Sequence, residues 1–207
     1  MAIAESLAIT SWGNHSDAIL AGPRARLLEI VRAAGKLPDV LGQNGQIRRD
    51  RLFFCHARAK DPHDRRYDER FLERLRTFIT PKAKRYGAQV FYDAQTISDG
   101  SEWNAEICAA LLSTRCAVFL VTPEFLTSEY VNDVELPYLT SESRVRELKI
   151  FPVLSRECCW TDVPLLAELQ FAHDIRTPLK SFTPSRRDRE LKAICDKVGH
   201  ALANAAE

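Results

Sequence analysis

The sequence predicts an α/β protein in which a parallel sheet carries helices on both faces. From residue 51 onward, short apolar runs alternate with amphipathic stretches, which is the pattern of βαβ units. The runs are continuously apolar, which suits strands that are buried on both faces. The composition, 45% hydrophobic and 28% charged, is that of a globular domain and not of a disordered chain. Because βαβ crossovers are right-handed, the doubly wound class is the expected arrangement.

Four apolar runs are expected to form strands, and the run at 117–121 has the strongest strand character. In chain order the runs lie at 52–55, 89–92, 117–121 and 148–154. Apolar residues at helical spacing predict helices at 71–79, 103–111, roughly 129–140 and 186–205. The first of these is expected to end where Pro81 interferes, and a sequence resembling a capping box at 185–188 marks the start of the last.

Residues 1–50 differ from the rest of the chain. They are interpreted as an N-terminal extension, partly helical and of unknown role, ahead of a domain at 51–205. Pro23 at the first helical position and Gly35 just past the end frame a short helix. Residues 35–46 are rich in Gly, Pro and Asn and are expected to form a linker.

Charge and cysteine content narrow the class of protein. The chain has 29 Lys and Arg against 28 Asp and Glu, a net charge of +1, which gives no overall argument for nucleic acid or an anionic membrane as partner. No apolar run approaches the roughly 18 residues of a membrane span, and no secretion signal is recognisable. The six cysteines form no CxxC pair, so we expect reduced thiols, no metal site and a cytoplasmic location.

Several common activities lack their motifs. The sequence contains no Walker loop, no GxGxxG and no GxSxG. A phosphoacceptor receiver domain would have an acidic pair after its first strand, where this chain has His56 and Ala57, and Asp93 follows the second strand instead of the third. In doubly wound proteins, ligands bind at the carboxyl ends of the strands. This rule directs attention to four segments, at 56–58, 93–103, 122–135 and 155–160.

Four stretches of sequence, in order, resemble the TIR domain, particularly its bacterial members. They read LFFCHARAKD, QVFYDAQTISDGSEW, CAVFLVTPEFLTSEYVNDVELPYL and KIFPVL. The resemblance covers about 51–175, with the helix at 186–205 as a last element. It implies a flavodoxin-like doubly wound parallel sheet of about five strands flanked by helices. The chain departs from the family in reading FFCHA where FISYS is commoner, and in its first fifty residues.

TIR domains divide into adaptors that only assemble and enzymes that cleave NAD+ at the nicotinamide–ribose bond. The enzymes depend on a glutamate in a motif resembling S-x-W-x-x-x-E-L. The matching stretch here is SEYVNDVEL at 128–136, so the resemblance implies that Glu135 is catalytic, with Ser128 and Tyr130 beside the substrate. Tyr130 stands where tryptophan is usual, and it precedes the glutamate by five positions instead of four.

Further residues are candidates for contacts with NAD+. Arg58 and His56 follow the first strand, near the expected phosphates, and an arginine can hold a pyrophosphate with a bidentate fork. Asp93 could bind a ribose hydroxyl or cap its loop, and Gly100 supplies a turn in the segment matching the family's BB loop. Trp103 could stack on a base or the nicotinamide, or could anchor its helix in the core.

The leading hypothesis is therefore an NAD+ nucleosidase that uses NAD+ as substrate and needs no separate cofactor. The resemblance implies activation by self-assembly with other TIR domains, a sensor domain or partner subunit, and a role in bacterial antiphage defence. The alternative is a non-catalytic adaptor or effector that acts through TIR–TIR contacts. Pro137, two residues past Glu135, is expected either to bend the helix and help aim that side chain or to end the helix.

Overall fold

The fold is built around a parallel sheet, as the sequence predicted. The structure is a computed structural model, and it describes residues 15–92 and 100–204. The strands are β1 (Arg51–Cys55), β2 (Gln89–Tyr92), β3 (Thr114–Val121) and β4 (Lys149–Leu154). They pair in parallel in the order β2-β1-β3-β4. The α/β class with a doubly wound parallel sheet is confirmed.

The described part of the chain contributes four strands to this sheet, where about five were expected. The segment after β4 runs along the edge of the sheet, where Ala172 N donates to Pro152 O at 2.8 Å. A ladder does not develop, because Pro152 has no N–H to donate. In addition, Leu154 N donates to the His173 ring, at 3.0 Å from Nε2. The segment instead forms the short helices η2 (Trp160–Asp162), α7 (Pro164–Ala167) and η3 (Leu179–Ser181).

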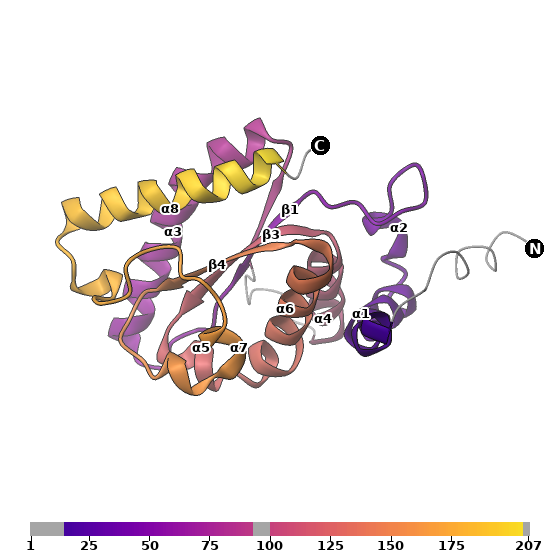
Figure 1. Cartoon of the computed structure of the whole chain (residues 1–207), viewed down its shortest axis with the longest axis horizontal. Coiled ribbons are helices and arrows are strands. Elements are labelled where there is room, and N and C mark those ends of the chain that lie inside the picture. Colours follow the sequence, from indigo (N-terminus) through magenta and orange to yellow (C-terminus); the bar gives the residue numbers. More distant parts are fainter. Residues whose placement is uncertain (1–14, 93–99, 205–207) are drawn as a thin grey trace, which may run out of the picture.

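Helices cover both faces of the sheet. Figure 1 shows α3 (Pro62–Arg85) and α8 (Pro184–Asn204) together on one face, and α4 (Gly100–Leu112) and α6 (Leu136–Arg146) on the other. Alternate residues of β1 divide between the two cores: Leu52 and Phe54 pack towards α3 and α8, while Phe53 and Cys55 pack towards α4 and α6. Between β3 and α6 lie α5 (Pro123–Thr127) and the π-helical turn η1 (Val131–Glu135).

The helix α3 continues through Pro81, so the prediction that it ends there was wrong. Proline removes one helical hydrogen bond, a cost of about 3 kcal/mol in a helix interior. The apolar face nevertheless continues beyond it, since Ile79 and Ala83 are both buried against the sheet. Tertiary packing therefore outweighs the local effect of the proline. At the other end, the Asp61 carboxylate caps the helix by accepting from His63 N at 2.9 Å and Asp64 N at 3.0 Å.

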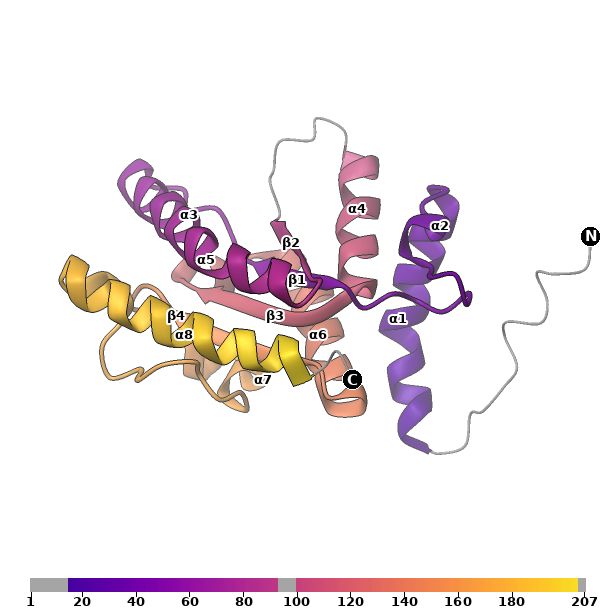
Figure 2. The same cartoon turned by 90° about the horizontal axis from the view of Figure 1, so that it is seen from above.

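The segment before β1 forms two helices, α1 (His15–Ala33) and α2 (Leu37–Val40). Figure 2 shows α1 beside α4, and its residues Leu27 and Val31 are buried. Pro23 lies inside α1 and not at its start, which corrects the prediction; the helix extends further towards the N-terminus. The expected linker contains α2 and is not wholly irregular, although Gly35 does adopt the positive φ of a residue past a helix end. Within the described ranges, no helix is both long and apolar enough to cross a bilayer.

Candidate functional site

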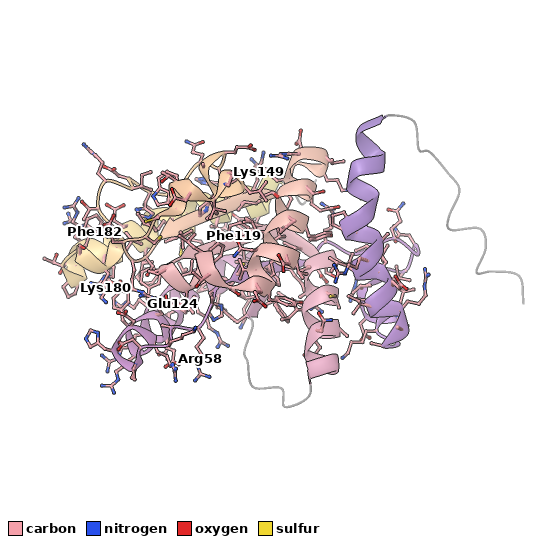
Figure 3. The ribbon with its side chains drawn as sticks, turned by 90° about the horizontal axis from the view of Figure 1, so that it is seen from below. Arg58, Phe119, Glu124, Lys149, Lys180 and Phe182 are labelled. Carbon is pink, nitrogen blue, oxygen red and sulfur yellow. The ribbon has the colours of Figure 1, made fainter. Side chains whose placement is uncertain are left out.

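A cavity of about 450 Å³ opens at the carboxyl end of β1, beside η1. This is the edge of the sheet at which doubly wound proteins bind their ligands. Five residues singled out from the sequence line this one cavity: His56, Arg58, Ser128, Tyr130 and Glu135. The other lining residues are Ala57, Ala59, Lys60, Arg65, Glu124, Thr127 and Val131. Arg58 and Glu124 are labelled in Figure 3.

Glu135 is the buried acid of this cavity. It is 1% exposed and ends the π-helical turn η1, in which Leu136 N donates to Val131 O, five positions back. The shifted hydrogen bonding directly precedes Pro137, which cannot donate to a backbone carbonyl. Pro137 therefore sits at the junction of η1 and α6, and the helix does not end there. This local change of pitch sets the direction in which Glu135 leaves the helix.

The thiol of Cys55 donates a hydrogen bond to Glu135 Oε2. Cys55 is the last residue of β1 and is fully buried. The sequence predicted a core residue here, and the burial agrees with that interpretation. What the sequence did not indicate is the polar contact, because the two residues lie 80 positions apart.

The side chain of Tyr130 is held in place by a hydrogen bond to α4. Its hydroxyl donates to Asn104 Oδ1 at 2.9 Å, and the Cys108 thiol donates to the same oxygen at 3.6 Å. Burial raises the pKa of the Cys108 thiol to about 11, so this thiol keeps its proton near neutral pH. Asn104 was not singled out from the sequence. The sequence could have indicated Asn104 as a polar residue on the apolar face of its helix, three and four residues before Ile107 and Cys108.

Ser128 has a local structural role in addition to lining the cavity. Its hydroxyl accepts from Val131 N at 3.4 Å, at the start of the turn that leads to Glu135. Asn132 reinforces the same turn by donating from Nδ2 to the backbone oxygens of Leu126, at 2.9 Å, and of Ser128, at 2.8 Å. The motif therefore fixes the backbone on which the acid is carried.

Basic side chains surround the mouth of the cavity. Arg58 is about half exposed and faces Glu69 at 3.9 Å, a loose surface ion pair. Lys60 is exposed, while Arg65 donates from Nε to Ala59 O at 2.9 Å and so supports the loop after β1. Lys60 and Arg65 were not among the predicted site residues, because the segment selected at the end of the first strand stops at residue 58. Together these cations favour an anionic ligand at the mouth.

Three candidates are not placed at the cavity. Asp93 lies outside the described residues. Gly100 is the first residue of α4, and Trp103 belongs to the same helix, but its side chain is outside the described part. Their proposed contacts with NAD+ therefore stay predictions. Glu106 pairs with Lys36 of the N-terminal segment at 3.2 Å.

Glu124, on the wall of the cavity, belongs to a cluster of charged side chains that has the buried residues Arg156 and Asp68 at its centre. Arg156, which follows β4, donates to Asp64 at 2.9 Å and to both carboxylate oxygens of Asp68 at 3.2 and 3.0 Å, and it also contacts Glu124. Lys180 lies 2.6 Å from Asp64, and its hydrogen bond lowers the pKa of Asp64. Burial raises the pKa of Asp68 to about 6. The cluster ties α5, which carries Glu124, to α3 and to the loop after β4.

Among the residues that the structure describes, one group of side chains has the spacing of metal ligands. Asp61, His63 and Asp64 bring ligand atoms within 4.8 Å of one another at the start of α3. Both carboxylates of this group already have other partners, since Asp61 caps the helix and Asp64 binds Lys180 and Arg156. These contacts explain why the three side chains lie close together, and no bound cation is needed to explain it.

Residues 53–191 match the family model of the TIR domain. The chain belongs to the TIR-domain family. The match confirms the family that the sequence motifs indicated, and it includes every described residue that lines the cavity. A search of curated proteins finds no match for the chain. Within this TIR domain, Glu135 is thus a buried carboxylate at a cavity with a basic mouth.

Proposed function

We propose that this TIR domain is an NAD+ nucleosidase that cleaves the nicotinamide–ribose bond, with Glu135 as its catalytic residue. The supporting observation is the position of Glu135. It is the buried acid of a 450 Å³ cavity at the carboxyl edge of the sheet, and it stands at the glutamate position of the family motif.

The chemistry of NAD+ explains why one acid suffices. Nicotinamide is bound as a cation and departs as a neutral ring, so its departure needs no general acid. The bond to C1′ of the ribose breaks with its electron pair going to the nicotinamide nitrogen, and positive charge develops on the sugar. An ionised carboxylate held beside that carbon stabilises the oxocarbenium-like transition state. Burial strengthens this interaction because the surroundings polarise less than water.

The remainder of the cavity suits the rest of the substrate. Arg58 and Lys60 at the mouth would hold the pyrophosphate, and the Tyr130 side chain offers an aromatic face to a ring. Water attacking C1′ gives ADP-ribose and releases a proton, whereas attack by a nitrogen of the tethered adenine gives a cyclic product. Either outcome releases one nicotinamide.

Membership of the TIR family supports the biological part of the proposal. We place the protein in the bacterial cytoplasm, in antiphage defence, and we expect self-assembly with other TIR domains to activate it. A sensor domain or partner subunit would supply the signal for assembly.

The test compares nicotinamide release by the wild type and Glu135→Gln at high protein concentration with NAD+. Removing a preorganised charge of this kind typically costs about 10² to 10³ in rate, so the variant should fall by that factor. Glu129→Gln is the matched control: it makes the same chemical change on an exposed residue of the same motif and should retain activity.

Two results would contradict the proposal. Equal release by wild type and Glu135→Gln would remove this residue from the mechanism. Absence of release from the wild type under every assembling condition would favour the adaptor, a module that acts through protein contacts alone.

A further inference from the structure

The contact between Cys55 and Glu135 joins two rigid elements of the fold. Cys55 ends β1 and pairs in register with Phe119 of β3, so strand pairing on that side fixes its backbone and leaves one rotatable bond to its sulfur. Glu135 ends η1 and reaches the sulfur with a side chain that has three rotatable bonds. Both residues are almost completely buried, at 0% and 1% exposure.

The hydrophobic surroundings of this contact increase its effect on the Glu135 carboxylate. Cys55 belongs to the core cluster between the sheet and the helices α4 and α6, where it lies among hydrophobic side chains such as Phe53, Phe119 and Val131. A carboxylate in such surroundings is strongly affected by each hydrogen bond it receives. A thiol is a weak donor, but here the strand holds it in place, so the interaction costs little additional ordering.

We propose that Cys55 is a positioning residue, whose thiol holds Glu135 in the orientation that NAD+ cleavage requires. This inference rests on the proposed function. By binding Oε2, the thiol fixes the rotation of the carboxylate about its last bond. The direction in which the acid presents its charge is then set by β1 and not by the flexible side chain alone.

The kinetic test uses Cys55→Ala and Cys55→Ser. Losing one such hydrogen bond is expected to lower kcat about tenfold in Cys55→Ala, with KM for NAD+ little changed because the thiol does not line the cavity. Since a donated hydrogen bond favours the ionised form of a carboxylate, the acid limb of the pH–rate profile should move to higher pH. Cys55→Ser retains a donor and should restore most of kcat and the original profile.

Cys116→Ala is the matched control. Cys116 is a buried thiol on β3 that packs on the opposite face of the sheet, towards α3 and α8. Its truncation leaves a similar cavity in the core but should change neither kcat nor the pH profile. A folded Cys55→Ala protein with wild-type kcat and profile would overturn the proposal.

A spectroscopic arm separates this inference from the proposed function. A hydrogen-bonded thiol has a lowered S–H stretching frequency, and the band of Cys55 is identified as the one lost in Cys55→Ala. In Glu135→Ala that band should move to higher frequency, whether or not the protein releases nicotinamide. An unshifted band would overturn the contact itself, whereas a shifted band in a protein without NAD+ cleavage would refute only the nucleosidase function.

Discussion

Among single residues, Asn104 makes a contact that can be measured without any assay of catalysis. Its side-chain oxygen accepts the hydroxyl of Tyr130 at 2.9 Å. Asn104→Ala and Tyr130→Phe should each lower the free energy of unfolding by about 1 kcal/mol, since each removes a hydrogen bond between two partly buried side chains. The double variant should lose little more than either single variant, as expected for two residues that share one interaction.

Urea denaturation of the four proteins checks this coupling. Additive losses in the double variant would mean that the two side chains act independently and that α4 does not hold Tyr130. Cys108→Ala provides a comparison, because the 3.6 Å contact of its thiol with the same oxygen is the weaker of the two.

The site residues that the sequence indicated and those that it did not differ in one physical respect. Glu135, Tyr130 and Ser128 lie within nine positions of one another and form one motif, so their spacing is visible in a single sequence. Cys55 and Asn104 act through side chains 80 and 26 positions away. Their own neighbours in the sequence are consistent with ordinary core positions, and only the pairing of β1 with β3 and the packing of α4 bring them to the site.

At the scale of helices and strands, the positions of the elements were predicted well but the effects of Pro23 and Pro81 were not. Pro23 lies within α1, Pro81 lies within α3, and Pro137 stands at the junction of η1 and α6. Each was expected to mark the limit or a bend of a helix on local grounds. In α3 the buried residues after the proline show the reason: contacts that are distant in the sequence outweigh one missing hydrogen bond.

The link between α3, α5 and the loop after β4 should depend on pH through Asp68. Burial raises its pKa to about 6 from an ordinary value of 3.8, so the folded protein holds this proton more tightly than the unfolded chain. The resulting stabilisation is fully present below about pH 4 and is lost as the pH rises through about 6. Because the charge of Arg156 favours the ionised form of Asp68 and so opposes the effect of burial, we expect this stabilisation to be about 1 to 2 kcal/mol across the window.

Thermal unfolding of the wild type and Asp68→Asn between pH 4 and 7 measures this effect. The variant should lack this part of the pH dependence. Asp188→Asn is the control: Arg74 lowers the pKa of Asp188 below the ordinary 3.8, so its contribution is constant between pH 4 and 7 and this variant should keep the pH dependence of the wild type. Identical pH dependence of stability in wild type and Asp68→Asn would show that Asp68 does not titrate in this window.

For the whole molecule, the fold class and family followed from the order of the elements, while the placement of the first fifty residues did not. The family model begins at residue 53, yet α1 packs against α4 with Leu27 and Val31 buried. An amphipathic helix shows in the sequence that it has an apolar face, but not which surface covers that face. The partner became visible only in the structure, together with the ion pairs around Glu142 of α6.

Glu142 links this N-terminal segment to the rest of the molecule. Its carboxylate is buried and accepts from Arg24 of α1, at 3.1 Å to each oxygen, and from Arg49 just before β1. Arg146 lies 3.6 Å away on the same helix. Glu142→Gln would leave three arginines around a neutral side chain. Because these arginines are partly exposed, we expect a loss of about 2 to 3 kcal/mol in the free energy of unfolding, below the full cost of breaking a buried pair.

Urea denaturation and hydrogen exchange together distinguish a shared core from a loosely attached segment. If α1 is part of one cooperative unit, Glu142→Gln should shift a single transition, and hydrogen exchange in α1 and α6 should accelerate together. Arg24→Ala combined with Glu142→Gln should lose less than the sum of the single variants, since it also removes an arginine left without its partner. Glu168→Gln, at an exposed pair with Arg144, is the control and should have little effect. Separate melting of α1, with the transition of the sheet unchanged, would show instead that the packing of α1 against α4 contributes nothing to the stability of the TIR domain.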